Sequence, residues 1–295
     1  MLPFRSLLMA LAVPALWGLG FVVAKAAMAH FPPILLMALR FTLTALVTVW
    51  FMPVPRGQLR ALCAIAFIAA AIQYSLTFTG LKGLDAGLAA LIVQLEVPFL
   101  VLLGALVLGE RPSLRKWAGI GLAFCGVALI AWNSGFSGGI VPMVLVIGGA
   151  FSWAVGQILV RRLPPISGAS LTAWIAVFAT PQLYLMSAIF ETGQVQAISE
   201  AGWPIWAAVA YLGLAMTALA YFLWYSLIRA HHVSMVAPYL LLLPVFSLVG
   251  GVVFLGETLS LWRLAGGAVV IAGVALISLE RPRRAKPVAI PPVSG

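Results

Sequence analysis

The chain has 295 residues, of which 63% are hydrophobic and only 8% are charged, and its mean hydropathy is +1.13. A soluble domain carries about 25% charged residues, so this composition excludes a water-facing globular fold. The net charge of +10 does not indicate nucleic-acid binding, because the 17 lysine and arginine residues are scattered between apolar runs and form no basic stripe. Such scattering is typical of the loops of a membrane protein.

Ten apolar runs follow one another along the chain, each close to the length of about 20 residues that a membrane-spanning helix needs. They lie near residues 7–27, 33–52, 61–81, 87–108, 114–132, 141–160, 170–190, 204–227, 233–255 and 261–279. The first run is too long for a signal-peptide core and is interpreted as a helix. Only short loops remain, so no extramembrane catalytic domain fits, and we predict an all-α integral membrane protein of ten transmembrane helices.

The loops alternate in charge. One side of the predicted membrane collects thirteen basic residues: Arg5, Arg56, Arg60, Arg111, Arg115, Lys116, Arg161, Arg162, Arg229, Arg281, Arg283, Arg284 and Lys286. The other side collects Lys25, Lys82 and Arg263. Because cytoplasmic loops carry the excess of Lys and Arg, we expect both termini in the cytoplasm of a bacterial inner-membrane, multi-pass protein. The basic, proline-rich tail 281–295 is expected to be disordered there.

The two halves of the sequence resemble each other. Residues 108–114 (LGERPSL) match residues 255–261 (LGETLSL), and GVALI at 126–130 recurs at 273–277. The matches divide the chain into residues 1–135 and 136–280, with five helices each. Because five is odd, the second half must enter the membrane from the opposite side. The fold expected is therefore a 5+5 inverted-topology repeat, which in secondary transporters surrounds a central cavity near the midplane.

The Gly-Glu steps at 109–110 and 256–257, the prolines Pro98 and Pro244, and Arg40-Phe41 resemble the EamA repeat of the drug/metabolite transporter superfamily. Nearly the whole chain is covered, in two copies. The tryptophan-bearing stretches around residues 17 and 153–157 look like those of the YddG-type amino-acid exporters. The resemblance implies export of aromatic and other neutral amino acids from a central cavity. Composition and spacing alone indicate only an inverted-repeat transporter.

Three charged residues are candidates for contact with an ion, a proton or a substrate carboxylate. Glu96 lies midway along the fourth run, where a carboxylate is expensive unless it faces a partner or a watery cavity, and it could bind a proton or an ammonium group. The alternative is a structural carboxylate. Arg40 could neutralise Glu96, bind a substrate carboxylate or snorkel to the interface, and we favour a structural pairing. Lys82 is an interface anchor that might meet a carboxylate at the cavity mouth.

Aromatic residues supply the remaining substrate-binding candidates. Trp17 and Trp153 occupy matching positions in the first and sixth runs, at a depth where indole is unusual, and Gln157 follows one helical turn after Trp153. We predict that the two rings stack on the substrate side chain and that Gln157 hydrogen-bonds its polar end, although packing is the alternative. Five further candidates share helix faces or follow in the ninth run: Tyr74, Phe78, Tyr221 with Trp224 or Tyr225, and Tyr239.

Pro98 and Pro244 each free a backbone carbonyl and should loosen the fourth and ninth helices as hinges or kinks. Small-residue spacings such as Gly119-x-x-x-Ala123 either pack the halves together or make a weak homodimer, so a monomer or weak dimer is expected. The cysteines Cys63 and Cys125 lie in apolar runs. No metal, cofactor or nucleic-acid partner is expected; the expected partners are the lipid bilayer and a small-molecule substrate such as an amino acid, and coupling to a proton is left open.

Several functions compete with amino-acid export by alternating access. Efflux of lipophilic drugs or cations, or of other metabolites, suits aromatic walls with Glu96 equally well. Sugar phosphates would call for several cavity arginines or lysines, and only Arg40 and Lys82 are near enough. An intramembrane enzyme is disfavoured because the runs hold no paired acids, Ser/His dyad or zinc-ligand set. A channel would show a filter sequence or a ring of charges, and none is apparent.

Overall fold

The structure is a computed structural model that describes residues 2–133, 140–231, 233–258 and 260–279. Within these ranges ten helical spans are long and apolar enough to cross a membrane: Phe4–Ala27, Pro33–Phe51, Leu59–Lys82, Ala86–Leu108, Leu114–Trp132, Ile140–Val160, Gly168–Phe190, Trp203–Ala230, Pro238–Leu255 and Leu261–Ser278. The ten predicted spans are thus confirmed, and their boundaries lie within about three residues of the predicted ones except at the start of the ninth span, which was predicted at residue 233 and begins at Pro238. The predicted tail 281–295 lies outside the described residues.

The helices, in chain order, are α1 (Phe4–Ala27), α2 (Pro33–Thr48), η1 (Val49–Phe51), α3 (Leu59–Ala66), η2 (Phe67–Ile72), α4 (Gln73–Lys82), α5 (Ala86–Val93), α6 (Glu96–Leu108), α7 (Leu114–Asn133), α8 (Ile140–Val160), α9 (Gly168–Phe190), α10 (Gln194–Ser199), α11 (Trp203–Ala210), η3 (Tyr211–Leu219), α12 (Ala220–Ala230), α13 (Val233–Val236), η4 (Ala237–Leu242), α14 (Leu243–Leu255) and α15 (Leu261–Ser278).

The third, fourth, eighth and ninth spans are not continuous α-helices. The third and the eighth each contain a π-helical segment, η2 and η3 respectively. The fourth is divided between α5 and α6, and the ninth passes through the 3₁₀ segment η4 into α14. Irregular backbone is tolerated at membrane depth where it is buried in protein or lines a cavity. The irregularities therefore indicate the part of the molecule where function should be sought.

The Gly-Glu steps have the same geometry in both halves. Gly109 and Gly256 end α6 and α14 with φ of 67° and 66°, in the left-handed region that favours glycine. The next N–H groups, of Glu110 and Glu257, each donate to a carbonyl six residues earlier, at a distance of 3.1 Å. The matched sequences thus end two helices in one way, as a structural repeat would.

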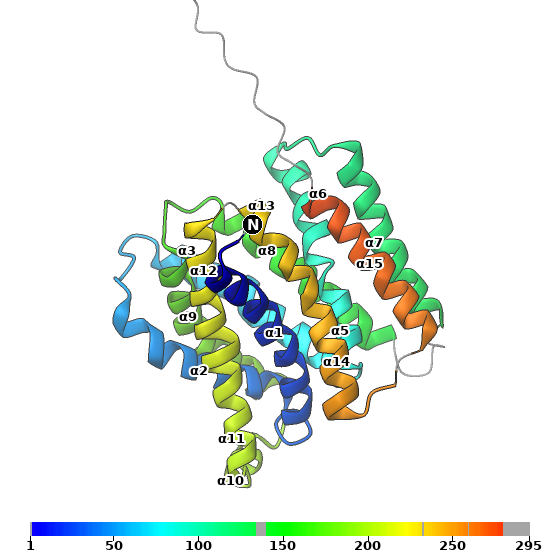
Figure 1. Ribbon diagram of the computed structural model, residues 1–295. Coiled ribbons are helices and arrows are strands. Elements are labelled where there is room, and N and C mark those ends of the chain that lie inside the picture. Colours follow the sequence, from blue (N-terminus) through cyan, green and yellow to red (C-terminus); the bar gives the residue numbers. More distant parts are fainter. Residues whose placement is uncertain (1, 134–139, 232, 259, 280–295) are drawn as a thin grey trace, which may run out of the picture.

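Small residues bring the two halves of the chain together. α7 and α15 lie side by side in Figure 1. A Cβ atom added to Gly119 of α7 would lie 2.7 Å from the carbonyl oxygen of Gly273 in α15, so only glycine allows this approach. The small-residue spacing thus packs α7 of the first half against α15 of the second.

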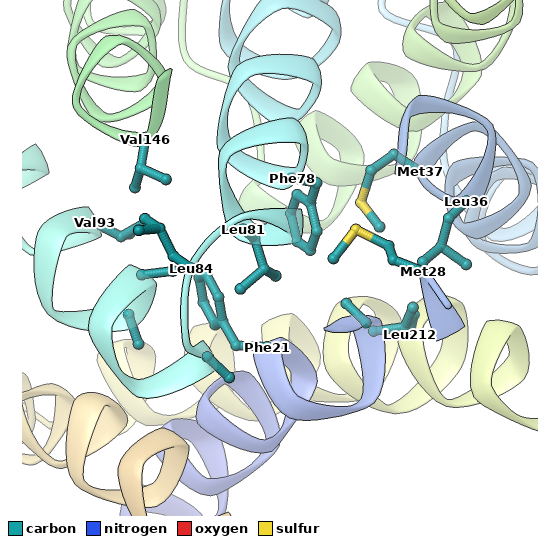
Figure 2. Close-up of a cluster of buried hydrophobic side chains, with 14 of the residues drawn as sticks. Phe21, Met28, Leu36, Met37, Phe78, Leu81, Leu84, Val93, Val146 and Leu212 are labelled. Atoms are coloured by element: carbon teal, nitrogen blue, oxygen red, sulfur yellow. The ribbon is translucent and has the colours of Figure 1, made fainter. Parts of the chain in front are cut away.

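The main apolar core also draws on both halves. Figure 2 shows Phe21 of α1, Phe78 and Leu81 of α4, Val146 of α8 and Leu212 of η3 converging among buried neighbours. In Figure 1 the beginning of α1 and the end of α15 lie at the same end of the molecule, and α10 lies at the other. An even number of spans requires the two described chain ends to share a side.

Candidate functional site

The interruption of the fourth span positions Glu96. After α5 ends, the N–H groups of Gln94 and Leu95 donate to carbonyls three residues back, at 3.2 and 3.0 Å, and α6 then begins at Glu96. Pro98 has no N–H to continue an α-helical pattern across this point. Glu96 consequently lies in the first turn of a half-helix, whose positive end favours a carboxylate. Its half-buried side chain forms no hydrogen bond or ion pair with another described residue.

The ninth span is interrupted in a corresponding place. The chain passes through the 3₁₀ segment η4 before α14 begins at Leu243, and Pro244 occupies the second position of α14. Both Pro98 and Pro244 are buried. The two prolines thus adjoin real breaks in their spans, while their predicted action as hinges remains a prediction.

Arg40 is enclosed in the middle of the helical bundle, with only 1% of its surface exposed. Its Nε donates to the Thr217 hydroxyl at 2.9 Å, and its guanidinium carbon lies 4.8 Å from the centroid of the Tyr74 ring and 5.5 Å from that of Phe41. No carboxylate among the described residues is within ion-pair distance of it, so pairing with Glu96 is not observed. Snorkelling to the interface is also wrong, because the guanidinium is buried by protein.

Tyr221 of α12 is within electrostatic range of both charges. It interacts electrostatically with Arg40, Glu96 and Tyr74, which belong to three different spans of the first half. Tyr221 also stacks on Tyr225, with ring centroids 5.9 Å apart, as their helical spacing predicts. The cation, the half-buried carboxylate and several phenol rings therefore lie in the same region of the helical bundle.

A second ring layer continues from Tyr74. Tyr74 stacks on Phe78 at 5.7 Å, which bears out the expectation that they share a face. Phe41 meets Tyr74 edge-on at 4.9 Å, and Phe21 stacks on Phe78 at 5.9 Å. Sequence reasoning missed Phe21 and Phe41 as members of this cluster; the direct adjacency of Phe41 to Arg40 was the signal that could have indicated one of them.

Trp17 joins the cluster from α1. Its ring centroid lies 5.4 Å from that of Tyr221 and 6.3 Å from that of Trp224. Its indole N–H donates to the carbonyl of Met216 in η3 at 3.0 Å. Tyr239 packs in the same apolar cluster as Trp17 and Trp224. Trp17 is thus fixed in place by the second half of the chain.

Trp153 and Gln157 of α8 are not brought into contact with these rings. Both are half-buried, and neither side chain forms a hydrogen bond or ring contact with any other residue in the described ranges. The serine beside Trp153 is engaged instead: Ser152 donates to the carbonyl of Ile68 in η2 at 2.6 Å. The two tryptophans that match in sequence therefore differ in surroundings.

The two π-helical segments contribute residues that sequence reasoning missed. A π-helix shifts carbonyls out of the regular ladder and is often found at functional sites. In η3, Thr217 accepts from Arg40 and donates to the carbonyl of Leu212 at 2.8 Å. In α4, directly after η2, the buried Gln73 has a side-chain oxygen without a hydrogen-bond partner among the described residues. Nothing in the hydropathy pattern distinguishes these segments from plain helix.

The other predicted charged residues lie at the ends of the spans. Lys82 is exposed at the end of α4, away from the cluster. Lys25 donates to the carbonyl of Leu84, and Arg263 pairs with Asp85 at the start of α5. Glu257 accepts from the N–H of Ala86 at 2.7 Å. These contacts tie α1, α5 and the loop before α15 together at one end of the molecule.

Comparison with known proteins places this geometry in a family. The model of the EamA-like transporter family matches residues 4–132 and 140–279. The chain belongs to the EamA-like transporter family. It is therefore a multi-pass membrane transporter, and its relatives support placement in a bacterial inner membrane. The family is one of transporters, a class that generally performs no covalent chemistry.

Two relatives of this EamA-family transporter are described as probable amino-acid metabolite efflux pumps. That of Salmonella typhimurium is 34% identical over 90% of this chain and 92% of its own, and that of Escherichia coli K12 is 30% identical over the same shares. A probable terminal-alkyne amino-acid exporter of Streptantibioticus cattleyicolor is 34% identical over 65% of this chain and 64% of its own. A solved crystal structure, 22% identical, covers 93% of this chain and 96% of its own with a TM-score of 0.63, which supports the fold alone.

Proposed function

We propose that the protein exports neutral and aromatic amino acids by alternating access. The observation that carries the proposal is the unpaired carboxylate of Glu96 beside a cluster of rings in mid-span. A carboxylate there can bind an ammonium group or a proton, and the rings offer apolar faces to a neutral side chain. Relatives described as amino-acid efflux pumps support the same substrate class.

The remaining parts of the site are assigned by their surroundings. Trp153 and Gln157, whose side chains are unengaged among the described residues, are free to contact substrate from α8. Tyr74, Phe78, Tyr221, Trp224 and Tyr239 form or support the aromatic wall. Pro98 and Pro244 loosen the two interrupted spans so that the halves can rock against each other. Lys82 could meet substrate only at the mouth.

The orientation belongs to the proposal as well. Residues 1–135 and 136–280 act as inverted repeats, supported by the equal helix ends at Gly109 and Gly256. Both termini face the cytoplasm, because thirteen basic residues fall on that side of the predicted topology and three on the other. Export is then movement from the side of the termini to the side of α10.

A transport assay tests the proposal directly. Purified protein in liposomes is given labelled phenylalanine, leucine, an organic cation and a sugar phosphate, with and without a pH gradient. We expect saturable flux of the two amino acids and none of the sugar phosphate. Flux of the sugar phosphate without flux of either amino acid would refute the assignment, and an effect of the gradient would reveal coupling to protons.

The second candidate function is efflux of lipophilic cations. Glu96 within an aromatic cluster favours it, because carboxylates and ring faces both attract organic cations. The same liposomes decide between the two: saturable flux of the organic cation, with no competition by amino acids, would replace the first proposal by the second.

A further inference from the structure

We propose that Arg40 binds the carboxylate of the transported molecule while Glu96 binds its ammonium group, so that the site selects free zwitterionic amino acids over amines. The inference rests on the proposed function and sharpens it, since it names the group on the protein that separates amino acids from lipophilic cations. Its support is the environment of a single guanidinium.

The first support is a buried cation without an anion. Among the described residues, the acidic side chains other than Glu96 lie near the ends of spans and are already engaged: Asp85 with Arg263, Glu110 with Arg161, Glu191 with the N–H groups of Ile34 and Leu35, Glu200 with Gln196, and Glu257 with the N–H of Ala86. None of them is available to Arg40. An ionised side chain inside a membrane protein needs a partner, and here the protein supplies only ring faces and a hydroxyl.

The second support is the set of donors that Arg40 leaves open. A guanidinium carries five N–H groups in a fork that matches a carboxylate. Thr217 takes the Nε donor, and the remaining hydrogen bond is from Nη1 to the sulfur of Met37 at 3.7 Å, a weak acceptor. The Thr217 bond thus fixes the plane of the fork while its Nη groups keep capacity for an incoming carboxylate.

The third support is the arrangement of two opposite charges, the guanidinium of Arg40 and the carboxylate of Glu96. Tyr221 is within electrostatic range of both Arg40 of α2 and Glu96 of α6, and these two residues form no ion pair with each other. An amino acid bound there would present its carboxylate to Arg40 and its ammonium to Glu96, and each buried charge would gain an opposite partner. An amine without a carboxylate would satisfy Glu96 and leave Arg40 uncompensated, in repulsion with the amine. The arrangement therefore disfavours simple organic cations.

The conformation described here has this subsite closed. The ring of Tyr74 lies over the guanidinium, and Arg40 is almost completely enclosed. Side chains that enclose Arg40 must therefore move before a carboxylate can reach its Nη groups.

Competition experiments test the inference. Uptake of labelled phenylalanine into proteoliposomes is measured against unlabelled phenylalanine, phenethylamine, which lacks the carboxylate, and 3-phenylpropionate, which lacks the ammonium group. For the unmodified protein we expect phenylalanine to compete at least about tenfold more strongly than either analogue, as the loss of one charge-assisted pair implies.

The matched variants are Arg40→Gln, Arg40→Lys and Arg115→Gln, the last removing one exposed cation at the beginning of α7. In Arg40→Gln, phenethylamine should compete as well as phenylalanine, whereas Arg115→Gln should keep the original ratio. Arg40→Lys retains the charge without the fork and should keep the preference for phenylalanine at reduced affinity. Glu96→Gln should do the reverse of Arg40→Gln and equalise phenylalanine with phenylpropionate.

The outcomes are separable. A folded Arg40→Gln protein with the original ratio of phenylalanine to phenethylamine would overturn the inference and leave amino-acid export standing. If Arg40→Gln does not fold, as judged by gel filtration in detergent, Arg40→Lys decides: equal competition by phenylalanine and by phenethylamine in that variant, which retains the charge, would overturn the inference. Absence of any phenylalanine uptake by the unmodified protein would remove the proposed function and the inference together.

Discussion

Two helix crossings, one in each half, are built from matching parts and nevertheless differ. α1 crosses the π-helical segment η3 at Gly20, and α8 crosses the π-helical segment η2 at Gly156. The two glycines occupy matching positions in the first and sixth spans. At each crossing a side chain donates to a carbonyl of the π-helix: Trp17 to Met216, and Ser152 to Ile68.

The difference between the crossings lies in the tryptophans. At the first crossing the indole itself is the donor, and Trp17 is held against Tyr221 and Trp224. At the second crossing Ser152 donates, which leaves Trp153 without a hydrogen bond or ring contact in the described part of the chain. Trp17 and Trp153 thus occupy matching sequence positions, yet the ring of Trp17 is held by contacts within the protein, whereas the ring of Trp153 remains available for contact with a substrate. The lesson is that a repeat preserves the crossing more strictly than the role of each side chain.

The largest effect is expected from adding one methyl group at each crossing. In Gly156→Ala the new Cβ would overlap the Cβ of Ala69 and lie 3.0 Å from its Cα, so backbone must move. In Gly20→Ala the overlap is with the end of the Met216 side chain, which can rotate away. We expect Gly156→Ala to lower stability by about 1–3 kcal/mol and Gly20→Ala by clearly less. Thermal unfolding in detergent measures both, and equal shifts would mean that the crossings do not differ in this way.

Substitution of each tryptophan separately tests its role. Trp17→Phe removes the bond to Met216 and should cost about 1 kcal/mol of stability, without changing the relative transport of aromatic and aliphatic amino acids. Trp153→Ala should leave the melting temperature nearly unchanged and selectively weaken transport of aromatic substrates. Melting curves and paired uptake of phenylalanine and leucine provide both readouts. An equal loss for the two substrates in Trp153→Ala would assign that ring to packing.

The smallest effect is expected at Ser152. Ser152→Ala removes the bond to Ile68 O and should lower stability by about 0.6 kcal/mol, the average for hydrogen bonds between helices in a membrane. The selectivity of transport should stay as it is. Ser152→Thr, which retains the hydroxyl, is the control. A larger loss in Ser152→Ala than in Trp17→Phe would show that the second crossing depends more on its hydrogen bond.

Much of the fold can be predicted from the sequence because a long apolar run directly indicates a segment that is buried in lipid. The ten spans, the turns at Gly109 and Gly256 and the shared face of Tyr74 and Phe78 need only local information. The prediction was less accurate for the start of the ninth span, which was expected at residue 233 and is observed at Pro238. The difference arises because a 3₁₀ segment occupies the entry of that helix. Hydropathy does not distinguish 3₁₀ or π segments from α-helix.

The site was harder to predict because its contacts join distant residues. Arg40 was chosen as a candidate from its charge in an apolar run, but its partner Thr217 is 177 positions away, and no local pattern connects them. The spacing that marked Trp17 and Trp153 as a pair carried no information on which of them would bond to a π-helix. Residue type and position in a span thus nominate candidates for the site, whereas the contacts between them come from the packing of one half against the other.

The most direct test of the central claim is the efflux of labelled phenylalanine from preloaded liposomes that contain the unmodified protein. The account predicts saturable efflux that is reduced by excess unlabelled leucine or tryptophan and much less by the same concentration of phenethylamine. Efflux that phenethylamine inhibits as strongly as phenylalanine does, or efflux no faster than from protein-free liposomes, would contradict it.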